Sequence, residues 1–193
     1  MSITISAYHE SKTFDGIIYE NSDLHFSEFE SCTFSNCNFC EATFLAVVFI
    51  DCTFINCNFE SAKINYVSLR TVHFIDCNLS SINFAMVDQF IFEVHFTDCL
   101  LDFSKFYSLK LKNTVFTNCS MIAMDFMNAD MTKVNFDGCD LYQAVFDKTN
   151  LNQADFRTSR NYSFNPAKNK VKKAIFSKDG LAGLLKSHDI VVV

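Results

Sequence analysis

The sequence has few of the residues that make turns, and it lacks tryptophan altogether. Its 193 residues include four glycines and one proline. So few of these residues exclude a fold built on many hairpin turns. No apolar run approaches the ~20 residues of a transmembrane helix. Residues 1–6 lack a basic stretch leading into a long apolar one, so we expect no signal peptide and a cytoplasmic protein without membrane contact.

Nine cysteines are present, a number that would suggest a disulfide scaffold in a secreted protein. Because no secretion signal is found, we expect free thiols instead. The length fits one domain.

Phenylalanine is abundant, and its spacing reveals an internal repeat. Steps of five residues from Phe14 to Phe84 meet an apolar residue every time. A second run, shifted in phase by two residues, extends from Ile91 to Phe156. Together 29 positions obey the rule, and 17 of them are phenylalanine. Neither a helix nor a simple strand has this period. The chain must therefore turn a corner every five residues, with the central residue and the residue two before it pointing inward.

Individual repeats resemble the pentapeptide-repeat family, whose consensus is Ala-Asp/Asn-Leu-X-X. Examples are residues 37–41 (CNFCE), 129–133 (ADMTK) and 154–158 (ADFRT). The resemblance covers roughly residues 12–158. It implies an all-β solenoid, a right-handed quadrilateral β-helix in which four pentapeptides make one coil of 20 residues.

The cysteine spacing supports a 20-residue coil independently. Six cysteines recur every 20 residues, except for one interval of 22 that spans the phase shift: Cys37, Cys57, Cys77, Cys99, Cys119 and Cys139. We expect them to form one internal column in about seven coils, with the β-helix occupying residues 1–158. The slip near residues 85–90, around Asp88 and Gln89, is interpreted as a bulge or a short outward loop. In the second run phenylalanine alternates with leucine or methionine, which predicts phenylalanine on two opposite walls.

Residues 159–193 are expected to form a C-terminal cap and dimerisation segment. A short amphipathic helix is predicted near residues 178–187, and an apolar strand-type tail at 190–193. Family members of the Qnr type, which the tail resembles, form two-fold dimers through their C-terminal ends. The resemblance implies a homodimer with contacts from Leu181, Leu184, Leu185, Ile190 and Val192. The alternative is a tail that only caps its own last coil.

Charge is distributed unevenly along the chain. Residues 1–156 carry 20 acidic and 8 basic side chains, whereas residues 157–193 carry 2 acidic and 8 basic side chains. An acidic rod does not bind nucleic acid directly, because phosphate recognition needs lysine and arginine. It can attract a protein that has a basic DNA-binding channel. Resemblance to the Qnr-type proteins implies a DNA mimic that engages DNA gyrase and topoisomerase IV and protects them from quinolones.

A plausible contact for such a partner is an acidic patch of Asp51, Asp76, Glu93, Asp98 and Asp102. The alternative function is a generic interaction scaffold with an unrelated protein partner, in which the acidic surface only maintains solubility. Some Qnr-type proteins carry long loops that help protection. Here the one interruption is the slip, so binding or inhibition without protection is a further possibility.

The sequence contains none of the common motifs of catalytic sites. The sequence has no glycine-rich phosphate loop, zinc-protease motif or nucleophile elbow, so we expect no enzyme, no catalytic residues and no cofactor. Stacked cysteines do not converge tetrahedrally, which favours core filling over a metal site. Cys40 is expected to point outward as the most reactive thiol. His73 and His95 occupy equivalent outward positions as a pair for pH sensing or metal binding, although two ligands without a third favour solvated histidines.

Overall fold

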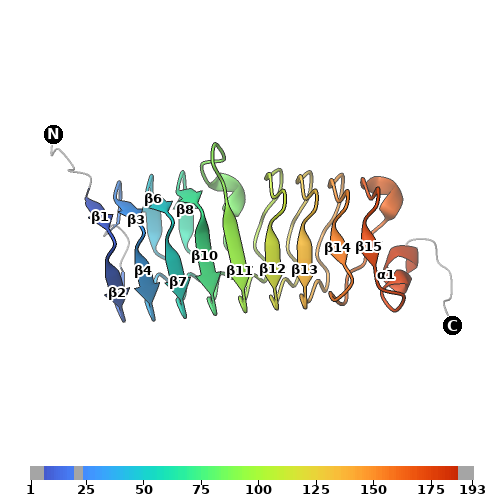
Figure 1. Ribbon diagram of the computed structural model, residues 1–193, viewed down its shortest axis with the longest axis horizontal. Coiled ribbons are helices and arrows are strands. Elements are labelled where there is room, and N and C mark those ends of the chain that lie inside the picture. The colour runs from blue at the N-terminus through green and yellow to red at the C-terminus, as the bar shows by residue number, and fades with distance from the viewer. Residues whose placement is uncertain (1–6, 20–23, 187–193) are drawn as a thin grey trace.

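The computed structural model describes residues 7–19 and 24–186. They form a rod of stacked coils, with the chain winding along it from one end to the other (Figure 1). One face of the rod, here called the long face, is a parallel sheet of nine strands. In chain order these strands are β2 (Thr13–Asp15), β4 (Thr33–Ser35), β7 (Thr53–Ile55), β10 (Val72–Ile75), β11 (Val94–Thr97), β12 (Val115–Thr117), β13 (Asn135–Asp137), β14 (Asp155–Phe156) and β15 (Ile175–Phe176).

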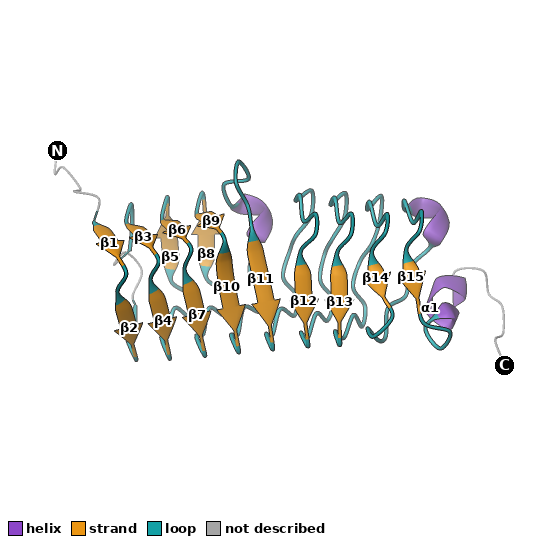
Figure 2. Cartoon of the chain, in the orientation of Figure 1, coloured by secondary structure: helices purple, strands orange, loops and turns teal. Residues whose placement is uncertain are grey.

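Eight steps separate the nine strands, so the solenoid has about eight turns rather than the seven expected. At ~4.8 Å a step its length is about 38 Å. The predicted four-sided parallel β-helix is confirmed. Figure 2 shows how short the strands are relative to the connecting segments.

The preceding face, called the charged face, begins with a parallel four-stranded sheet. It contains β1 (Tyr8–Glu10), β3 (Glu28–Glu30), β6 (Val48–Ile50) and β9 (Ser68–Arg70). Beyond β9 the same side continues as single bridges. A third face consists of single bridges from Ile18 to Arg160. The fourth face holds the paired strands β5 (Thr43–Leu45) and β8 (Lys63–Asn65), followed by the 3-10 helix η1 (Phe84–Met86) and further bridges.

The core is a set of ring stacks that run along the rod. On the long face nine phenylalanines from Phe14 to Phe176 stack in register, with neighbouring ring centroids 4.7–5.6 Å apart. On the opposite wall Phe106, Phe126 and Phe146 form a second stack. The predicted alternation is thus confirmed in the second half, because Leu and Met occupy the two walls between. Each inner ring packs against the rings of the coils before and after it, which fills the narrow interior.

The corners explain why so little glycine suffices. Among the described residues, 26 non-glycine residues have a positive φ, and they recur two residues after the central position. This left-handed conformation costs most side chains about 1–2 kcal/mol. Most corners are held by a backbone hydrogen bond to the next coil, such as Ser31 N to Ile50 O at 2.9 Å and Asp76 N to Thr97 O at 3.0 Å. Many corner residues are Asn, Asp or Ser, and Asn and Asp tolerate this conformation best.

The phase slip is an outward loop between η1 and β11, visible above the other coils in Figure 1. Asp88 still pairs with Ser68, as the first single bridge of the charged face beyond β9. Ile91, predicted to begin the second inward run, is instead 46% exposed. Val87 and Phe92 fill the interior in its place, because the loop leaves the coil between them.

The solenoid extends one coil beyond residue 158, where the sequence analysis ended it. Asp155 pairs with Ile175, and Phe156 with Phe176. Within this last coil lies the 3-10 helix η2 (Pro166–Lys168). The sequence pattern does not reveal this extra coil, because Asn161 and Pro166 stand where the repeat requires apolar central residues. Helix α1 (Leu181–Leu185) then covers the end of the rod, and the predicted strand at 190–193 lies outside the described residues.

Candidate interaction surfaces

Two of the predicted acidic residues lie together at one corner of the rod. Asp76 and Asp98 both have a positive φ and follow the adjacent strands β10 and β11. They line a shallow cleft of about 180 Å³ together with Asn56, Asn78 and Leu100. The register between β10 and β11 therefore places the two carboxylates one coil apart, beside the edge of the long face.

Asp51 and Glu93 lie on the other side of the long face, near the two histidines. His73 and His95 are in register, with their rings stacked at 4.8 Å and 17°. Glu93 Oε1 is 3.8 Å from His95 Nε2. Burial, and secondly the neighbouring His95, lower the pKa of His73, while Glu93 and Asp51 oppose this shift. The predicted pairing of the histidines is confirmed.

Asp102 is separate from the other four acidic residues. It follows the third face and accepts hydrogen bonds from Ser120 Oγ at 2.7 Å and from Ile122 N at 2.9 Å. Its carboxylate therefore has a structural role in joining two coils. The five residues do not form one patch. They form a pair at one edge of the long face, a pair at the other edge, and a single residue elsewhere.

The slip residues hold the outward loop in shape. The carboxylate of Asp88 accepts hydrogen bonds from Phe90 N at 3.0 Å and Ser68 Oγ at 2.7 Å. These bonds lower the pKa of Asp88. Gln89 Nε2 donates to Ala85 O. The ring of Phe90 is 87% exposed, the highest value among the large apolar side chains described.

The predicted dimer residues have different environments within one chain. Leu184 is buried in the chain's own core. Leu185 is half-buried, and Leu181 is 44% exposed. Ile190 and Val192 lie outside the described residues. Helix α1 thus caps the last coil with Leu184 and leaves Leu181 available to a partner.

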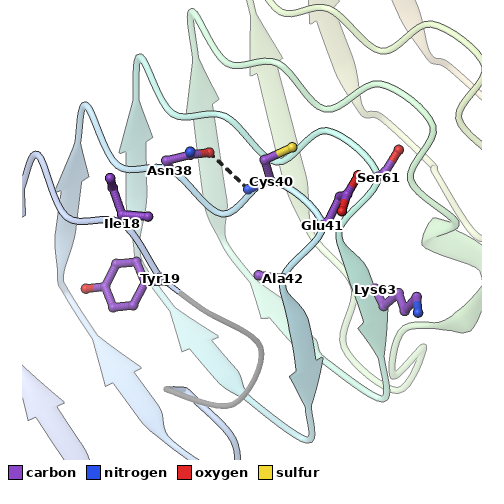
Figure 3. A pocket seen from close by; sticks show the side chains of 8 residues that line it. All are labelled: Ile18, Tyr19, Asn38, Cys40, Glu41, Ala42, Ser61 and Lys63. Atoms are coloured by element: carbon purple, nitrogen blue, oxygen red, sulfur yellow. Dashed lines mark hydrogen bonds between the residues drawn. The ribbon is translucent and has the colours of Figure 1, made fainter.

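Cys40 is exposed, as predicted, and borders the hollow drawn in Figure 3. The hollow has a volume of about 550 Å³. Asn38 Oδ1 accepts a hydrogen bond from Cys40 N at 3.0 Å. Desolvation, followed by the nearby carboxylates of Glu41 and Glu60, raises the pKa of Cys40. The thiol is accessible, but less of it is ionised than in an ordinary cysteine.

The other eight cysteines are buried and form no disulfide bonds. The thiols of the six-residue column donate to backbone carbonyls, as Cys99 Sγ does to Phe74 O at 3.4 Å. Burial raises the pKa of Cys52, which lies outside this column, to about 11. Within residues 7–19 and 24–186, no group of three or more His, Cys, Asp or Glu is placed to hold a metal ion. None of the helices in this part is long and apolar enough to cross a bilayer.

The charge of the rod changes sign along its axis. Residues 1–104 contain 14 acidic and 3 basic side chains, whereas residues 105–193 contain 8 acidic and 13 basic side chains. The net charges of the two segments are therefore −11 and +5. The first segment makes about five coils, which occupy about 24 Å. The acidic character belongs to this half of the rod alone.

Comparison with known proteins agrees with this architecture. A family model described as "Pentapeptide repeat region" matches residues 27–89 and 90–165. No curated protein matches the chain in sequence. A trypsin-treated variant of QnrB1, described as a plasmid-mediated fluoroquinolone resistance protein, superposes with a TM-score of 0.78 at 12% identity, covering 98% of this chain and 100% of that one. A second trypsin-treated variant of QnrB1 superposes with a TM-score of 0.62 at 15% identity, and the match covers 97% of this chain and 100% of that one. The chain belongs to the pentapeptide-repeat family, and its fold resembles that of QnrB1.

Proposed function

We propose that this chain is a non-catalytic, cytoplasmic binding protein whose acidic half imitates duplex DNA and engages DNA gyrase or topoisomerase IV. The observation that carries the proposal is the linear charge density. A net −11 over about 24 Å corresponds to one charge per ~2.2 Å. Duplex DNA has one charge per ~1.7 Å of axis. A basic DNA-binding channel would therefore attract this half of the rod almost as strongly as it attracts DNA.

The fold supports the proposal through its shape. The coils stack without branching, and the described part of the acidic half has no outward loop before residue 85. Carboxylates occur at both edges of the long face, as Asp51 and Asp76 show. The likeness to QnrB1 shows the fold alone. The link to topoisomerases therefore depends on charge and on the family resemblance.

A DNA gyrase supercoiling assay tests the proposal. At micromolar concentrations the protein should inhibit supercoiling in the absence of ciprofloxacin or restore it in its presence. The first outcome identifies an inhibitor and the second a protector. No effect in either condition would contradict the proposal and favour a scaffold with another partner.

Matched charge variants show whether the acidic half makes the contact. Asp76→Asn with Asp98→Asn removes two charges, and asparagine accepts the positive φ at both corners. Exposed charge pairs contribute roughly 0.2–1 kcal/mol each, so the half-maximal concentration should rise roughly 2- to 30-fold. Asp147→Asn with Asp179→Asn, in the other half, is the matched control and should leave it unchanged. Equal effects of both pairs would mean that the acidic half is not the contact.

The proposal includes a homodimer formed through the C-terminal end. Leu181 and the segment that follows helix α1 would supply the contacts, because Leu184 is already used within the chain. Light scattering on the full-length chain should give twice the monomer mass, and Leu181→Asp should restore the monomer. A full-length monomer would show that the end of the rod is only capped.

A further inference from the structure

The charged face carries a group of lysines in the second half of the rod. Eight lysines lie on this face or at its two edges, and all are exposed. The group, called the lysine surface, consists of Lys110, Lys112, Lys133, Lys148, Lys168, Lys170, Lys172 and Lys173. The expectation of no nucleic-acid contact rests on the summed charge of the rod, which averages this surface with the acidic half.

Backbone pairing fixes the positions of these lysines. Lys110, Asp130, Asn150 and Lys170 form one row of successive bridges. Three steps of ~4.8 Å place Lys110 and Lys170 about 14 Å apart along the rod. At one edge of the face Lys148 N donates to Lys168 O at 3.1 Å. The lysines therefore cover a broad area on one side of the rod.

Most of this positive charge is not neutralised within the chain. Among the described residues, Lys112 is the one lysine of the group with an ion pair, to Asp130 at 3.3 Å. Asp130 also accepts hydrogen bonds from Thr132 and Asn150, so it is fully engaged. The two nearby arginines on other faces differ, because Arg157 pairs with Asp155 and Arg160 with Asp140.

The residues between the lysines indicate the kind of polyanion that fits. Outward positions of the rows that begin at Lys110, Lys112 and Asn113 are occupied by Lys, Asp, Asn, Thr and Gln alone. A membrane-binding surface would need apolar side chains to insert. A single-strand-binding surface would need aromatic rings on which bases stack. Lysine with Asn and Thr suits the phosphates of a duplex, which these side chains contact without reading sequence.

We propose that the lysine surface binds the phosphate backbone of a nucleic-acid duplex, independently of base sequence. The competing partner is a second copy of this chain, because the described part of the acidic half carries six carboxylates on the same face and its edges: Glu10, Glu28, Glu30, Asp51, Asp88 and Glu93. Six carboxylates would leave at least two of the eight lysines without an opposite charge, and Asp88 and Glu93 already have partners within the chain. A duplex offers a phosphate for each of them. The acidic half repels a duplex only weakly, since charges more than ~8 Å away are screened at physiological salt.

Fluorescence anisotropy with a labelled 20-base-pair DNA duplex tests this proposal on the full chain. If about four phosphates are neutralised, log K should fall with log salt with a slope of about −3.6, a loss of about 10²-fold between 50 and 200 mM. Lys170→Gln with Lys172→Gln should raise Kd about 10²-fold at 50 mM salt and reduce the slope by about 2. Lys12→Gln with Lys63→Gln, outside the lysine surface, is the matched control and should change neither value.

Three outcomes would overturn the proposal. One is the absence of binding at 50 mM salt with protein at roughly 100 µM, the weak end of non-specific affinity. Another is an equal loss in both variant pairs. The third is a salt-sensitive dimer, seen by sedimentation and lost in Lys170→Gln with Lys172→Gln, without DNA binding. That result would assign the lysine surface to a second copy.

Discussion

Phe116 lies near the middle of the nine-ring stack, and truncation of its side chain should show how much the stack contributes to stability. Its side chain is fully buried, with ring centroids 5.3 Å from Phe96 and 5.6 Å from Phe136. Phe116→Ala should lower the free energy of unfolding by about 4 kcal/mol, since truncation of a buried phenylalanine leaves a cavity. The loss of two stacked neighbours adds to this cost.

Urea unfolding followed by far-UV circular dichroism measures the change, with equal slopes required for the comparison. Phe116→Leu should cost only about 1–1.5 kcal/mol, because leucine fills most of the same space. Phe90→Ala is the control at an 87% exposed ring and should stay within about 0.5 kcal/mol of the parent. Similar midpoints for Phe116→Ala and Phe90→Ala would refute the view that the ring stack supports the rod.

Three other predictions concern single sites. Gly183→Ala should release helix α1 and lower the Tm, because an added Cβ would overlap with the backbone carbonyl oxygen of Tyr162. An unchanged Tm would show that the helix is not docked there. With a maleimide at pH 7, one thiol of nine should react in the native protein, slowly because the pKa of Cys40 is raised, and Cys40→Ser should abolish the reaction; a second reacting thiol would contradict the burial of the columns. The pKa of His73 is lowered by burial and by His95, so the contribution of the neutral imidazole to stability is present above pH ~6.5 and is lost as pH falls below that value. His73→Gln should therefore reduce the fall in Tm between pH 7.5 and 5.5. An unchanged fall in Tm would show that other groups cause it.

The five-residue period predicts the architecture because every coil buries apolar side chains at the same positions of its repeats. The positions of Cys77 and Cys99 revealed the slip without any structural information, since the column must stay in line. The last coil is not predictable from the period, because Asn161 and Pro166 break the apolar pattern, although Val171 and Phe176 keep the register. The five-residue period therefore reveals a coil only where the central positions of its repeats are apolar.

The surfaces were less predictable than the core. Asp76 and Asp98 could be placed together because they stand 22 residues apart across the slip. The sequence analysis places Asp102 in the same patch, but the chain turns a further corner before this residue, and its carboxylate accepts a hydrogen bond from Ser120. The lysine surface was hidden because its members are spread over 64 sequence positions, from 110 to 173. Stacking brings them to one face, which a count along the chain does not show.

The central claim is that the acidic half occupies the DNA-binding channel of a type II topoisomerase, and a displacement experiment tests it most directly. Labelled duplex DNA is bound to DNA gyrase at 150 mM salt, and this protein is added while anisotropy is recorded. A parallel titration without gyrase accounts for direct DNA binding by the lysine surface. The DNA should be released from gyrase as the protein binds, and Asp76→Asn with Asp98→Asn should release it less efficiently. A stable complex that contains gyrase, DNA and this protein together, with no DNA released, would contradict the claim.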